Sequence, residues 1–561
     1  MTNNSGISAQ EFKTNVLFYG DNLDILRRYI PNESIDLIYL DPPFNSKADY
    51  NILFKEATGE ESTAQIQAFS DFWHWDDAAR HAYEFLTSNE VDAKVSDVTD
   101  ALYRFLGKND MTAYLFMMAR RLLELHRVLK STGSLFLHCD STASHYLKLV
   151  LDAIFGIENF RNEVVWKRFN FHADARRFGR VADRILFYSK TSEYKFNRQR
   201  APFKQDYVDS KFTHKEGNRR FRLSDLNPPA LRGPIYEFHG ITRPWRFTKE
   251  KMLQLEKEGR IYTDSKVPQL KRYLDELEAA GGAAVHEIWD DIPAINSQAK
   301  ERLGYPTQKP TELLERIINA CTDGKDDWVL DPFCGCGTTI AAAEKLRRHW
   351  IGIDITYLAI SLVKGRLRDS FPDAKFEVEG EPRDLGAAVE LAKNRYQFQW
   401  WALSLIGARP TGSTEAKPRE GRKGADEGVD GWLRFPVADH FERIVVSVKS
   451  GHVGVKDIRE LRDTVSRQKA AMGMFITLEE PTSEMIKEVK VTEPYISPTW
   501  HHEYPKLQIL TVEELLKGKR PSMPQVENSF KKAPTEERAT RSTSTKLFQN
   551  DKRHGAPTLS P

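Results

Sequence analysis

Two acidic motifs, far apart in the sequence, each follow a short apolar segment. The first is Asp41-Pro42-Pro43-Phe44, which comes directly after the apolar residues 35–40. Neither proline can donate a backbone hydrogen bond, and each restricts the residue before it, so the loop is rigid. It offers a carboxylate, a carbonyl and an aromatic ring at the end of a strand, where open α/β sheets bind ligands. Taken alone, the tetrapeptide is equally consistent with a strand-ending turn.

The second motif, Asp331-Pro-Phe-Cys-Gly-Cys-Gly-Thr338, follows a predicted strand over residues 328–330. Its glycines would let a ligand approach the backbone, and the helix predicted to begin at Thr338 favours a carboxylate at its N-terminus. We expect the hydroxyls of Thr338 and Thr339 to cap that helix. Asp354 ends the next predicted strand and is placed to accept hydrogen bonds from ribose hydroxyls. Asp331 suits a cationic amine beside a carboxylate, and S-adenosylmethionine carries both groups and a ribose.

The composition describes an ordinary globular protein of several domains. The chain has 561 residues, of which 40% are hydrophobic and 29% charged, with a net charge of +2. This length exceeds what one hydrophobic core supports. No long apolar run is present, so we expect no membrane span. Four cysteines are too few for a disulfide framework and suit a reducing, cytoplasmic location. Cys334 and Cys336 are better explained as small loop residues than as metal ligands.

Alternating strand and helix patterns place both motifs in one α/β domain. Residues 15–160 contain the first half, with a polar, aromatic insertion over residues 45–110. An amphipathic helix then carries apolar residues at helical spacing over 115–129, and we expect Gly133 to end it. The pattern resumes over residues 301–375, which contain the second motif. We therefore predict a parallel sheet assembled from two distant parts of the chain.

The segment between the two halves, residues 161–300, is basic and aromatic. From Arg161 to Asp225 there are 17 Lys and Arg against 8 Asp and Glu, a net charge of +9 (17 minus 8), with twelve aromatic residues. Such a segment can be a solvated face, but phosphate neutralisation and base stacking require the same residue types. Because no strand–helix repeat is visible, we interpret it as an inserted recognition domain.

The order of these features resembles the β-group of DNA amino-methyltransferases, which includes the modification subunits of type III restriction systems. The D-P-P-F loop, the basic segment, Pro306-Thr-Gln-Lys-Pro310 and D-P-F-x-G-x-G-T-T occur in that order over about residues 15–370. In this group the catalytic loop precedes the cofactor loop, a circular permutation relative to most methyltransferases. The resemblance implies a Rossmann-like, S-adenosylmethionine-dependent fold with an inserted target-recognition domain.

The resemblance also implies roles for single residues. Asp41 and the Pro42 carbonyl, in the loop shaped by Pro43, would accept hydrogen bonds from an exocyclic amine, while Phe44 stacks on a flipped base. No metal is needed for this step. Because D-P-P-[YF] accompanies N6-adenine more often and S-P-P-Y accompanies N4-cytosine, we expect adenine. Asp354 would bind the ribose, Gly20 and Asp21 the adenine side, and the other cofactor residues the methionine end: Lys309, Asp331, Pro332, Phe333, Gly335, Gly337 and Thr338.

Residues 385–520 form a further predicted α/β unit, with one long helix over 387–407, and residues 521–561 read as a disordered tail. Gly424–Gly431 and then 444–449 resemble the Mrr-like branch of PD-(D/E)xK nucleases. The resemblance implies a site at Asp430, position 447 and Lys449, in which Asp430 is a candidate Mg²⁺ ligand. Ser447 replaces the expected acid or Gln, which leaves cleavage open. Asp426, Glu427 or a first-helix residue would have to supply the missing ligand.

These observations favour a DNA adenine-N6 methyltransferase of a restriction–modification or related defence system, with double-stranded DNA as partner. An N4-cytosine methyltransferase is the near alternative. A nuclease or DNA-binding protein whose front domain only senses the cofactor is the alternative from another class. A separate restriction subunit is a candidate partner that the sequence leaves open, together with the recognition sequence and the oligomeric state.

Overall fold

The computed structural model describes residues 14–43, 75–169, 176, 178–228, 232–296, 299–303, 308–410, 429–437, 440–498, 501–524 and 533–538. The chain divides into two compact units. Unit 1 contains the described residues up to Asn197 and from Glu287 onward, and unit 2 is Arg198–His286. Both predicted motifs lie in unit 1. No helix among the described residues is long and apolar enough to cross a membrane.

A nine-stranded sheet forms the centre of unit 1. In spatial order, its strands are β14 (Ile288–Trp289), β4 (Phe160–Lys167), β5 (Ala182–Ser189), β3 (Leu129–Cys139), β2 (Ile35–Leu40), β15 (Trp328–Asp331), β16 (His349–Asp354), β1 (Asn15–Tyr19) and β17 (Phe376–Glu379). β5 runs antiparallel to both neighbours, and the other pairs are parallel, so the sheet is mixed. β2 is buried along its whole length, as expected for a strand covered on both faces.

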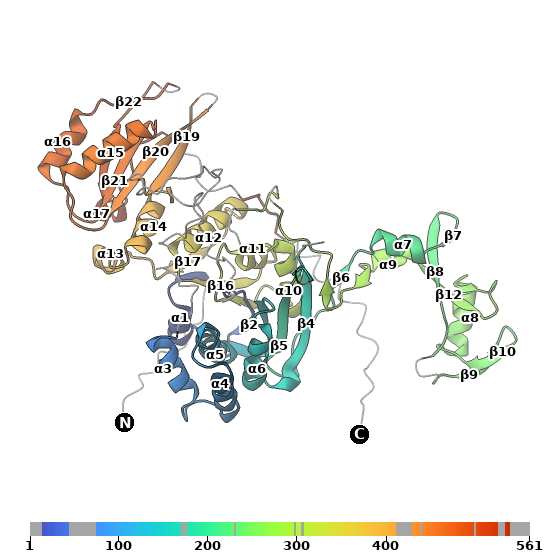
Figure 1. Cartoon of the computed structure of the whole chain (residues 1–561). Coiled ribbons are helices and arrows are strands. Elements are labelled where there is room, and N and C mark those ends of the chain that lie inside the picture. Colours follow the sequence, from blue (N-terminus) through green and yellow to red (C-terminus); the bar gives the residue numbers. More distant parts are fainter. Residues whose placement is uncertain are drawn as a thin grey trace. The chain divides into compact units, whose positions relative to one another are not determined.

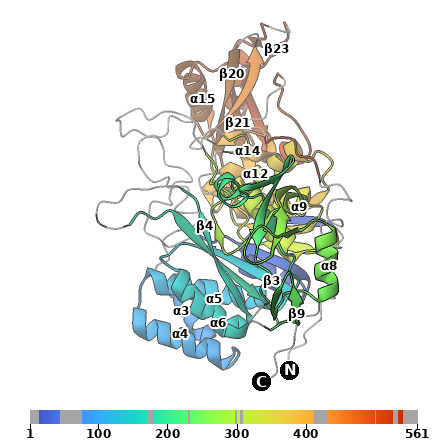
Figure 2. The same cartoon turned by 90° about the vertical axis from the view of Figure 1, so that its right-hand side faces the viewer.

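Helices cover the sheet, and Figure 2 shows one group of them together on one side of β3 and β4. That group comprises α3 (Asp77–Leu86), α4 (Ala93–Leu106), α5 (Asp110–Val128) and α6 (Ser144–Phe155), and α1 (Asn22–Tyr29) also packs against α5. A second group of helices contacts β2, β15, β16 and β1. It comprises α10 (Thr311–Cys321), α11 (Thr338–Lys345) and α12 (Tyr357–Ser370). Sequence-distant halves thus share one sheet, as predicted.

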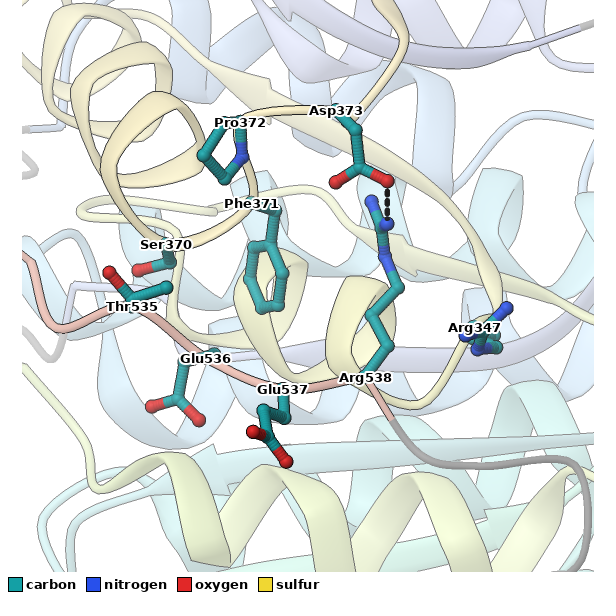
Figure 3. Close-up of a pocket in the computed structure, with 9 residues that line it drawn as sticks. All are labelled: Arg347, Ser370, Phe371, Pro372, Asp373, Thr535, Glu536, Glu537 and Arg538. Carbon is teal, nitrogen blue, oxygen red and sulfur yellow. Dashed lines mark hydrogen bonds and ion pairs between the residues drawn. The ribbon is translucent and has the colours of Figure 1, made fainter.

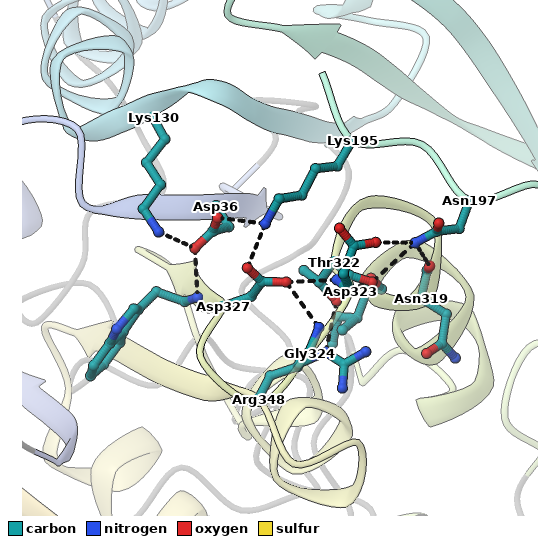
Figure 4. Close-up of polar contacts among 12 residues, drawn as sticks. Asp36, Lys130, Lys195, Asn197, Asn319, Thr322, Asp323, Gly324, Asp327 and Arg348 are labelled. Carbon is teal, nitrogen blue, oxygen red and sulfur yellow. Dashed lines mark hydrogen bonds and ion pairs between the residues drawn. The ribbon is translucent and has the colours of Figure 1, made fainter. Parts of the chain in front are cut away.

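A buried ion network fixes the amino-terminal ends of β2 and β15 (Figure 4). The carboxylate of Asp36 accepts hydrogen bonds from Lys130 (2.6 Å), Lys195 (3.1 Å) and the Trp328 amide (3.0 Å). Lys195 also pairs with Asp327 (2.6 Å), just before β15. Because Asp36 is 2% exposed, leaving its charge unpaired would be costly. The network sets the two strands side by side, and their carboxyl ends therefore meet at the opposite edge.

The structure differs from the sequence prediction at two places in the first half. The predicted polar insertion contains α3 and α4 in its described part, which bury Leu86 and Leu102. Gly133 does not end the preceding helix: α5 ends at Val128, and Gly133 lies inside β3. A side chain there would meet Leu129 at 2.7 Å and the Asp36 carbonyl at 3.0 Å, so the glycine serves close strand packing.

The basic segment is divided between the two units. Its first part supplies β4 and β5 to the main sheet, whereas the sequence predicts that the insertion begins at residue 161. Neither strand shows a regular alternation, because polar residues (161–163 and 183–184) precede short apolar runs (164–166 and 185–188). Unit 2 (green in Figure 1) is the remainder. It contains β6 (Arg200–Ala201), α7 (Gln205–Lys211), β7 (His214–Glu216), β8 (Arg219–Ser224), β9 (Ile235–Phe238), β10 (Ile241–Pro244), α8 (Lys249–Lys257), β11 (Ile261–Tyr262), β12 (Gln269–Tyr273), α9 (Leu274–Ala279) and β13 (Ala283–Ala284).

A second sheet of unit 1 forms the predicted nuclease-like part. Its order is β18 (Arg409–Pro410), β19 (Gly431–Val437), β20 (His440–Lys449), β21 (Met472–Thr477) and β24 (Leu507–Thr511). The expected long helix is broken into α13 (Leu385–Leu391) and α14 (Arg395–Leu405), because Asn394 caps the second helix through the Gln397 amide (3.2 Å). Trp401 and Phe398 join α12 residues in one core. The remaining elements are α15 (Val455–Arg467), α16 (Ser483–Val491), β22 (Tyr495–Ile496), β23 (Glu503–Tyr504) and α17 (Val512–Leu516).

Part of the tail predicted to be disordered is bound to the main domain. Residues 533–538 lie against the end of α12, where Arg538 pairs with Asp373 (Figure 3). Arg538 also pairs with Glu344 of α11. Glu536 pairs with Lys345 at 3.1 Å. Together with Arg347 and Phe371, this segment lines a pocket. Glu344 is 7% exposed, and a buried carboxylate that needs a cation explains why a polar segment is ordered here.

Candidate active site

The first acidic motif lies at the carboxyl end of β2. Asp41 is partly buried, and its Oδ2 pairs with Lys309. Its Oδ1 is buried and has no hydrogen-bond partner among the described residues. Pro42 is buried and Pro43 half-buried beside it, while Phe44 lies outside the described residues. A buried acceptor without a donor is costly, so this oxygen is suited to a donor brought by a ligand.

Lys309 contacts the loop at Asp41, whereas the resemblance assigned it to the cofactor. Its segment is held by Gln308, which accepts from the Leu303 amide (2.8 Å) and donates to the Glu301 carbonyl (2.6 Å). Its ammonium pairs with Asp41, and both side chains are largely shielded from water. Pro306 and Thr307 lie outside the described residues. Lys309 thus joins the segment before α10 to the loop after β2.

The second acidic motif forms a tight loop between β15 and α11. Gly335 and Gly337 have positive φ angles of 49° and 74°. A side chain on Gly337 would also meet Val363 at 2.7 Å. Gly337 itself is the N-cap of α11, without a side-chain cap, so the predicted threonine caps are wrong. Thr339 instead bonds Asp331, and Thr338 accepts from Arg366 (3.2 Å). Uncapped amides at this end favour an anion.

The register of the sheet brings the acids of the two motifs together. Leu330 pairs with Ile38, so Asp331 and Asp41 lie at the same edge. Asp331 is 3% exposed. Burial raises its pKa to about 7, the Thr339 hydroxyl and the Phe333 amide oppose this, and the charges of Asp41 and Asp354 raise it further. An aspartate whose charge is disfavoured in this way is poised to receive a cationic group.

Asp354 and Gly20 complete the rim of the loop. Asp354 accepts hydrogen bonds from the Gly335 amide (2.9 Å) and from the amide and hydroxyl of Thr356 (both 2.9 Å). Burial raises the pKa of the Asp354 carboxyl, and these hydrogen bonds oppose that rise. The Gly20 amide donates to the Asp354 carbonyl at 3.0 Å. The carboxylate therefore shapes the glycine loop, a role that the ribose assignment did not include.

Asp21 caps α1 through the Leu23 amide (2.7 Å) and pairs with Arg121 (2.8 Å). The next residue, Asn22, was missed by sequence reasoning. It donates to the Pro332 carbonyl (2.8 Å) and accepts from Arg121 (2.5 Å), so it ties the first strand–helix turn to the cofactor loop. Its position directly after Gly20-Asp21, at the start of a helix, was the available signal.

A buried polar chain lies beneath the catalytic strand. The Tyr39 hydroxyl contacts His138 Nδ1 at 2.9 Å, and His138 Nε2 contacts Asp183 at 3.0 Å. Burial would raise the pKa of Asp183, but His138 and Arg168 hold it below its ordinary value. Tyr39 stands two residues before Asp41. The chain therefore fixes β2 against β3 and β5, and it favours a structural role for His138.

The nuclease-like part has a carboxylate that is already satisfied. Asp430 accepts hydrogen bonds from the Val448 amide (2.7 Å), Ser447 (3.3 Å) and Gln399 of α14 (3.0 Å). Burial raises its pKa, and the Val448 amide and Lys449 oppose the shift. Asp426 and Glu427 lie outside the described residues. Among the residues that are described, no three His, Cys, Asp or Glu side chains could hold a metal ion together.

The residues at the sheet edge fit S-adenosylmethionine. Asp331 suits its ammonium group, and the uncapped amides after Gly337 suit its carboxylate. A side chain at Gly337 would collide with Val363 of α12, so this turn accepts only glycine. Beside this loop, Asp41 presents an unpartnered acceptor. The fold and site thus define an α/β protein in which a cofactor loop adjoins an acidic loop, as a group-transfer enzyme requires.

Residues 35–364 match the sequence model of the DNA methylase family N6_N4_Mtase, which spans more than half of the chain. The protein therefore belongs to this family of DNA methylases. Residues 416–517 match a second model, described as NACHT-associated inactive Restriction Endonuclease 1. An inactive restriction-endonuclease-like domain agrees with the satisfied Asp430 and with Ser447 in place of an acid. The assignment to the Mrr-like branch is not confirmed.

Curated relatives are DNA methyltransferases of restriction–modification systems. The chain is 27% identical to the Type II methyltransferase M.EcaI of Enterobacter cloacae over 63% of its own length and 69% of that protein. It is 28% identical to the Type III enzyme StyLTI Mod subunit of Salmonella typhimurium, over 60% of this chain and 50% of that subunit. The chain thus spans only about half the length of this type III relative.

Solved structures show weaker likeness. A DNA modification methylase of Thermus thermophilus, TTHA0409, in complex with S-adenosyl-L-methionine, is 16% identical with a TM-score of 0.31, over 65% of this chain and 98% of that one. The cytosine-N4-specific PvuII DNA methyltransferase is 15% identical with a TM-score of 0.29, over 63% and 86%. Family membership therefore rests on the sequence match.

Proposed function

We propose that the protein transfers a methyl group from S-adenosyl-L-methionine to the N6 amine of adenine at specific sites in duplex DNA. The observation that carries the proposal is the buried, unpartnered Oδ1 of Asp41, on the same sheet edge as the Asp331 loop. This oxygen needs a donor, and an exocyclic amine is one. Membership of the DNA methylase family supports the same reaction.

The arrangement addresses the weakness of an aromatic amine as a nucleophile, since its lone pair is delocalised into the ring. Asp41 Oδ1 and the Pro42 carbonyl would each accept one amine N–H, which directs the lone pair out of the ring plane. S-adenosyl-L-methionine supplies the electrophilic methyl group when it is bound. Transfer would form an N–C bond at the expense of the S–C bond of the bound cofactor, and Asp41 Oδ1 would be the adjacent acceptor for the proton that the nitrogen then loses. Such orientation can supply several kcal/mol of the barrier reduction.

Lys309 acts on Asp41 in this proposal. Its ammonium occupies Oδ2, which leaves Oδ1 for the substrate and holds the carboxylate in one orientation. Asp331 and the amides after Gly337 hold the methionine end of the cofactor, and Asp354, Gly20 and Asp21 hold its nucleoside end. Phe44 would stack on the flipped base, as base-flipping enzymes require. The remaining positions of the loop, Pro332, Phe333, Gly335 and Thr338, shape its backbone.

Adenine is favoured over cytosine by the D-P-P-F motif and by the type III Mod subunits among the relatives. The family description names both N6 and N4 methylases, so N4-cytosine is the alternative. We further propose a circularly permuted, β-group order, target recognition by the insertion, and action in a restriction–modification system in which a separate restriction subunit is a candidate partner.

Incubation of the full chain with duplex DNA and methyl-labelled cofactor, followed by hydrolysis to nucleosides, tests the proposal. We expect labelled N6-methyladenine. Asp41→Ala should abolish transfer while cofactor affinity stays nearly unchanged, because Asp41 lies beside the cofactor loop and not in it. Asp326→Ala, an exposed aspartate near the other end of β15, is the matched control and should be fully active. Labelled N4-methylcytosine would refute the adenine assignment, and an unlabelled DNA would refute the reaction.

A further inference from the structure

In unit 2, arginines of the four-stranded sheet (β11, β12, β8 and β7) and of the segment after β10 fall into two groups. In the first group, each guanidinium has a carboxylate partner. Arg219 bonds Asp275 (2.8 and 3.1 Å) and Glu276 (2.7 Å). Arg220 bonds Asp209 at 3.0 Å. These pairs are largely exposed to solvent, and each guanidinium has its counter-charge within the unit.

The second group contains Arg222, Arg246 and Arg272, and none of them has a carboxylate partner among the described residues. Arg222 on β8 lies directly opposite Arg272 on β12 in the antiparallel register. Cross-strand partners project from the same face of a sheet, with Cβ atoms roughly 5 Å apart. Arg246 joins them from the segment after β10, where its amide donates to the Leu226 carbonyl at 2.9 Å. The charges of Arg246 and Arg222 both act on Arg272, so the three cations lie near one another.

This cluster is unfavourable in the free protein. Like charges directly opposite each other destabilise a sheet. Burial lowers the pKa of Arg272, and the neighbouring charges of Arg246, Arg222 and Arg260 lower it further. The Nε of Arg222 is buried and has no acceptor among the described residues. A buried donor without an acceptor is rare in folded proteins and calls for an explanation.

We propose that Arg222, Arg246 and Arg272 form a binding site for the phosphates of the DNA backbone. The inference rests on the proposed function, which requires duplex DNA as substrate. A phosphodiester would supply acceptors for the planar guanidinium forks and neutralise their mutual repulsion. Phosphate contacts set the position of a protein on DNA and carry no sequence information directly. The cluster therefore acts in affinity and positioning.

A salt titration of DNA binding by the full chain tests this site. The observed affinity of a DNA-binding protein falls with salt, and each lost phosphate contact reduces the slope of log K against log salt by about 0.9. Arg222→Gln, Arg246→Gln and Arg272→Gln should each reduce the slope by about that amount and weaken binding to unrelated duplexes equally. Arg219→Gln is the matched control: it removes the same charge from the same sheet, yet its guanidinium already has carboxylate partners.

Thermal unfolding provides a second readout. Because Arg222 and Arg272 repel each other, Arg272→Gln should leave the melting temperature unchanged or raise it while DNA binding weakens. If the arginine were needed only for folding, its replacement would lower the melting temperature and leave DNA binding by the folded protein unchanged. Slopes that stay at the wild-type value in all three variants would overturn the site, as would an equal slope change in Arg219→Gln. Wild-type protein without salt-dependent DNA binding would overturn the proposed function and this site together.

Discussion

Asp331 makes cofactor binding depend on pH in a way that the structure specifies. In the free protein, burial and the neighbouring acids raise the pKa of this carboxyl to about 7. Only the ionised form can pair with the ammonium of S-adenosylmethionine. Below about pH 7 the carboxyl must therefore lose a proton before it can bind the ammonium, and cofactor affinity falls as the pH is lowered.

The magnitude follows from the pKa. Well below pH 7 the free carboxyl is mostly protonated and affinity changes about tenfold per pH unit. Because about half of the carboxyl is ionised at about pH 7, a rise from about pH 5 to about pH 7 should strengthen binding by roughly 50-fold, or about 2.3 kcal/mol. Near pH 8 the α-amino group, with an ordinary pKa of about 7.7–8.0, loses its own proton, and the affinity should decline again. We therefore expect cofactor affinity to be highest between about pH 7 and about pH 8.

Isothermal titration of the full chain with cofactor across this pH range measures the profile. Asp331→Asn is the matched variant, because its amide oxygen can still accept from the Phe333 amide (3.0 Å in the wild type) but carries no charge. This variant should bind the cofactor weakly, and its affinity should no longer fall as the pH is lowered below about 7. A folded-state pKa raised above the unfolded value of about 3.9 means that the cofactor-free protein loses stability as the pH rises from about 4 to 7. Asp331→Asn should therefore be the more stable protein at about pH 8. Wild-type affinity that is constant from about pH 5 to 7, matched by the variant, would refute the reasoning.

Three further outcomes are expected. Gly337→Ala should reduce cofactor affinity and cost roughly 1–3 kcal/mol, because φ is 74° and its Cβ would meet Val363 at 2.7 Å; unchanged binding and melting temperature would contradict this. His138→Phe should destabilise the protein by roughly 3 kcal/mol, since it leaves buried Asp183 without its histidine; an equally stable variant would exclude the structural role. Supercoiled plasmid with Mg²⁺ should stay intact for wild type and for Lys449→Ala alike, and cutting that depends on Lys449 would show an active nuclease.

The sequence revealed the two acidic motifs, but it did not reveal the contacts that hold them in place. Asp41 and Asp331 were recognisable because each follows an apolar strand and precedes residues that force a turn, which are local properties. The same local signals identified β2, β15 and most helices of the α/β part. Both β4 and β5 were assigned to the insertion because their apolar runs are short and do not alternate with polar residues, so no clean strand period marks them.

Other contacts were decided only by the tertiary structure. Lys309 pairs with Asp41, 268 residues away in the chain, and no local pattern shows which carboxylate it meets. Asn22 reaches the Pro332 carbonyl and is held by Arg121, and both residue types are ordinary at a protein surface. The ordered segment 533–538 depends on buried Glu344, which a polar composition cannot reveal.

By itself, then, the sequence determined that a rigid acidic loop and a glycine-rich cofactor loop occur in one chain, since both depend on backbone restrictions written into neighbouring residues. The tertiary structure decided that they meet, through the pairing of β2 with β15 and the ion network around Asp36 at the other end. It also decided the electrostatics: the pKa of Asp331 is raised because folding removes water and brings Asp41 and Asp354 near it.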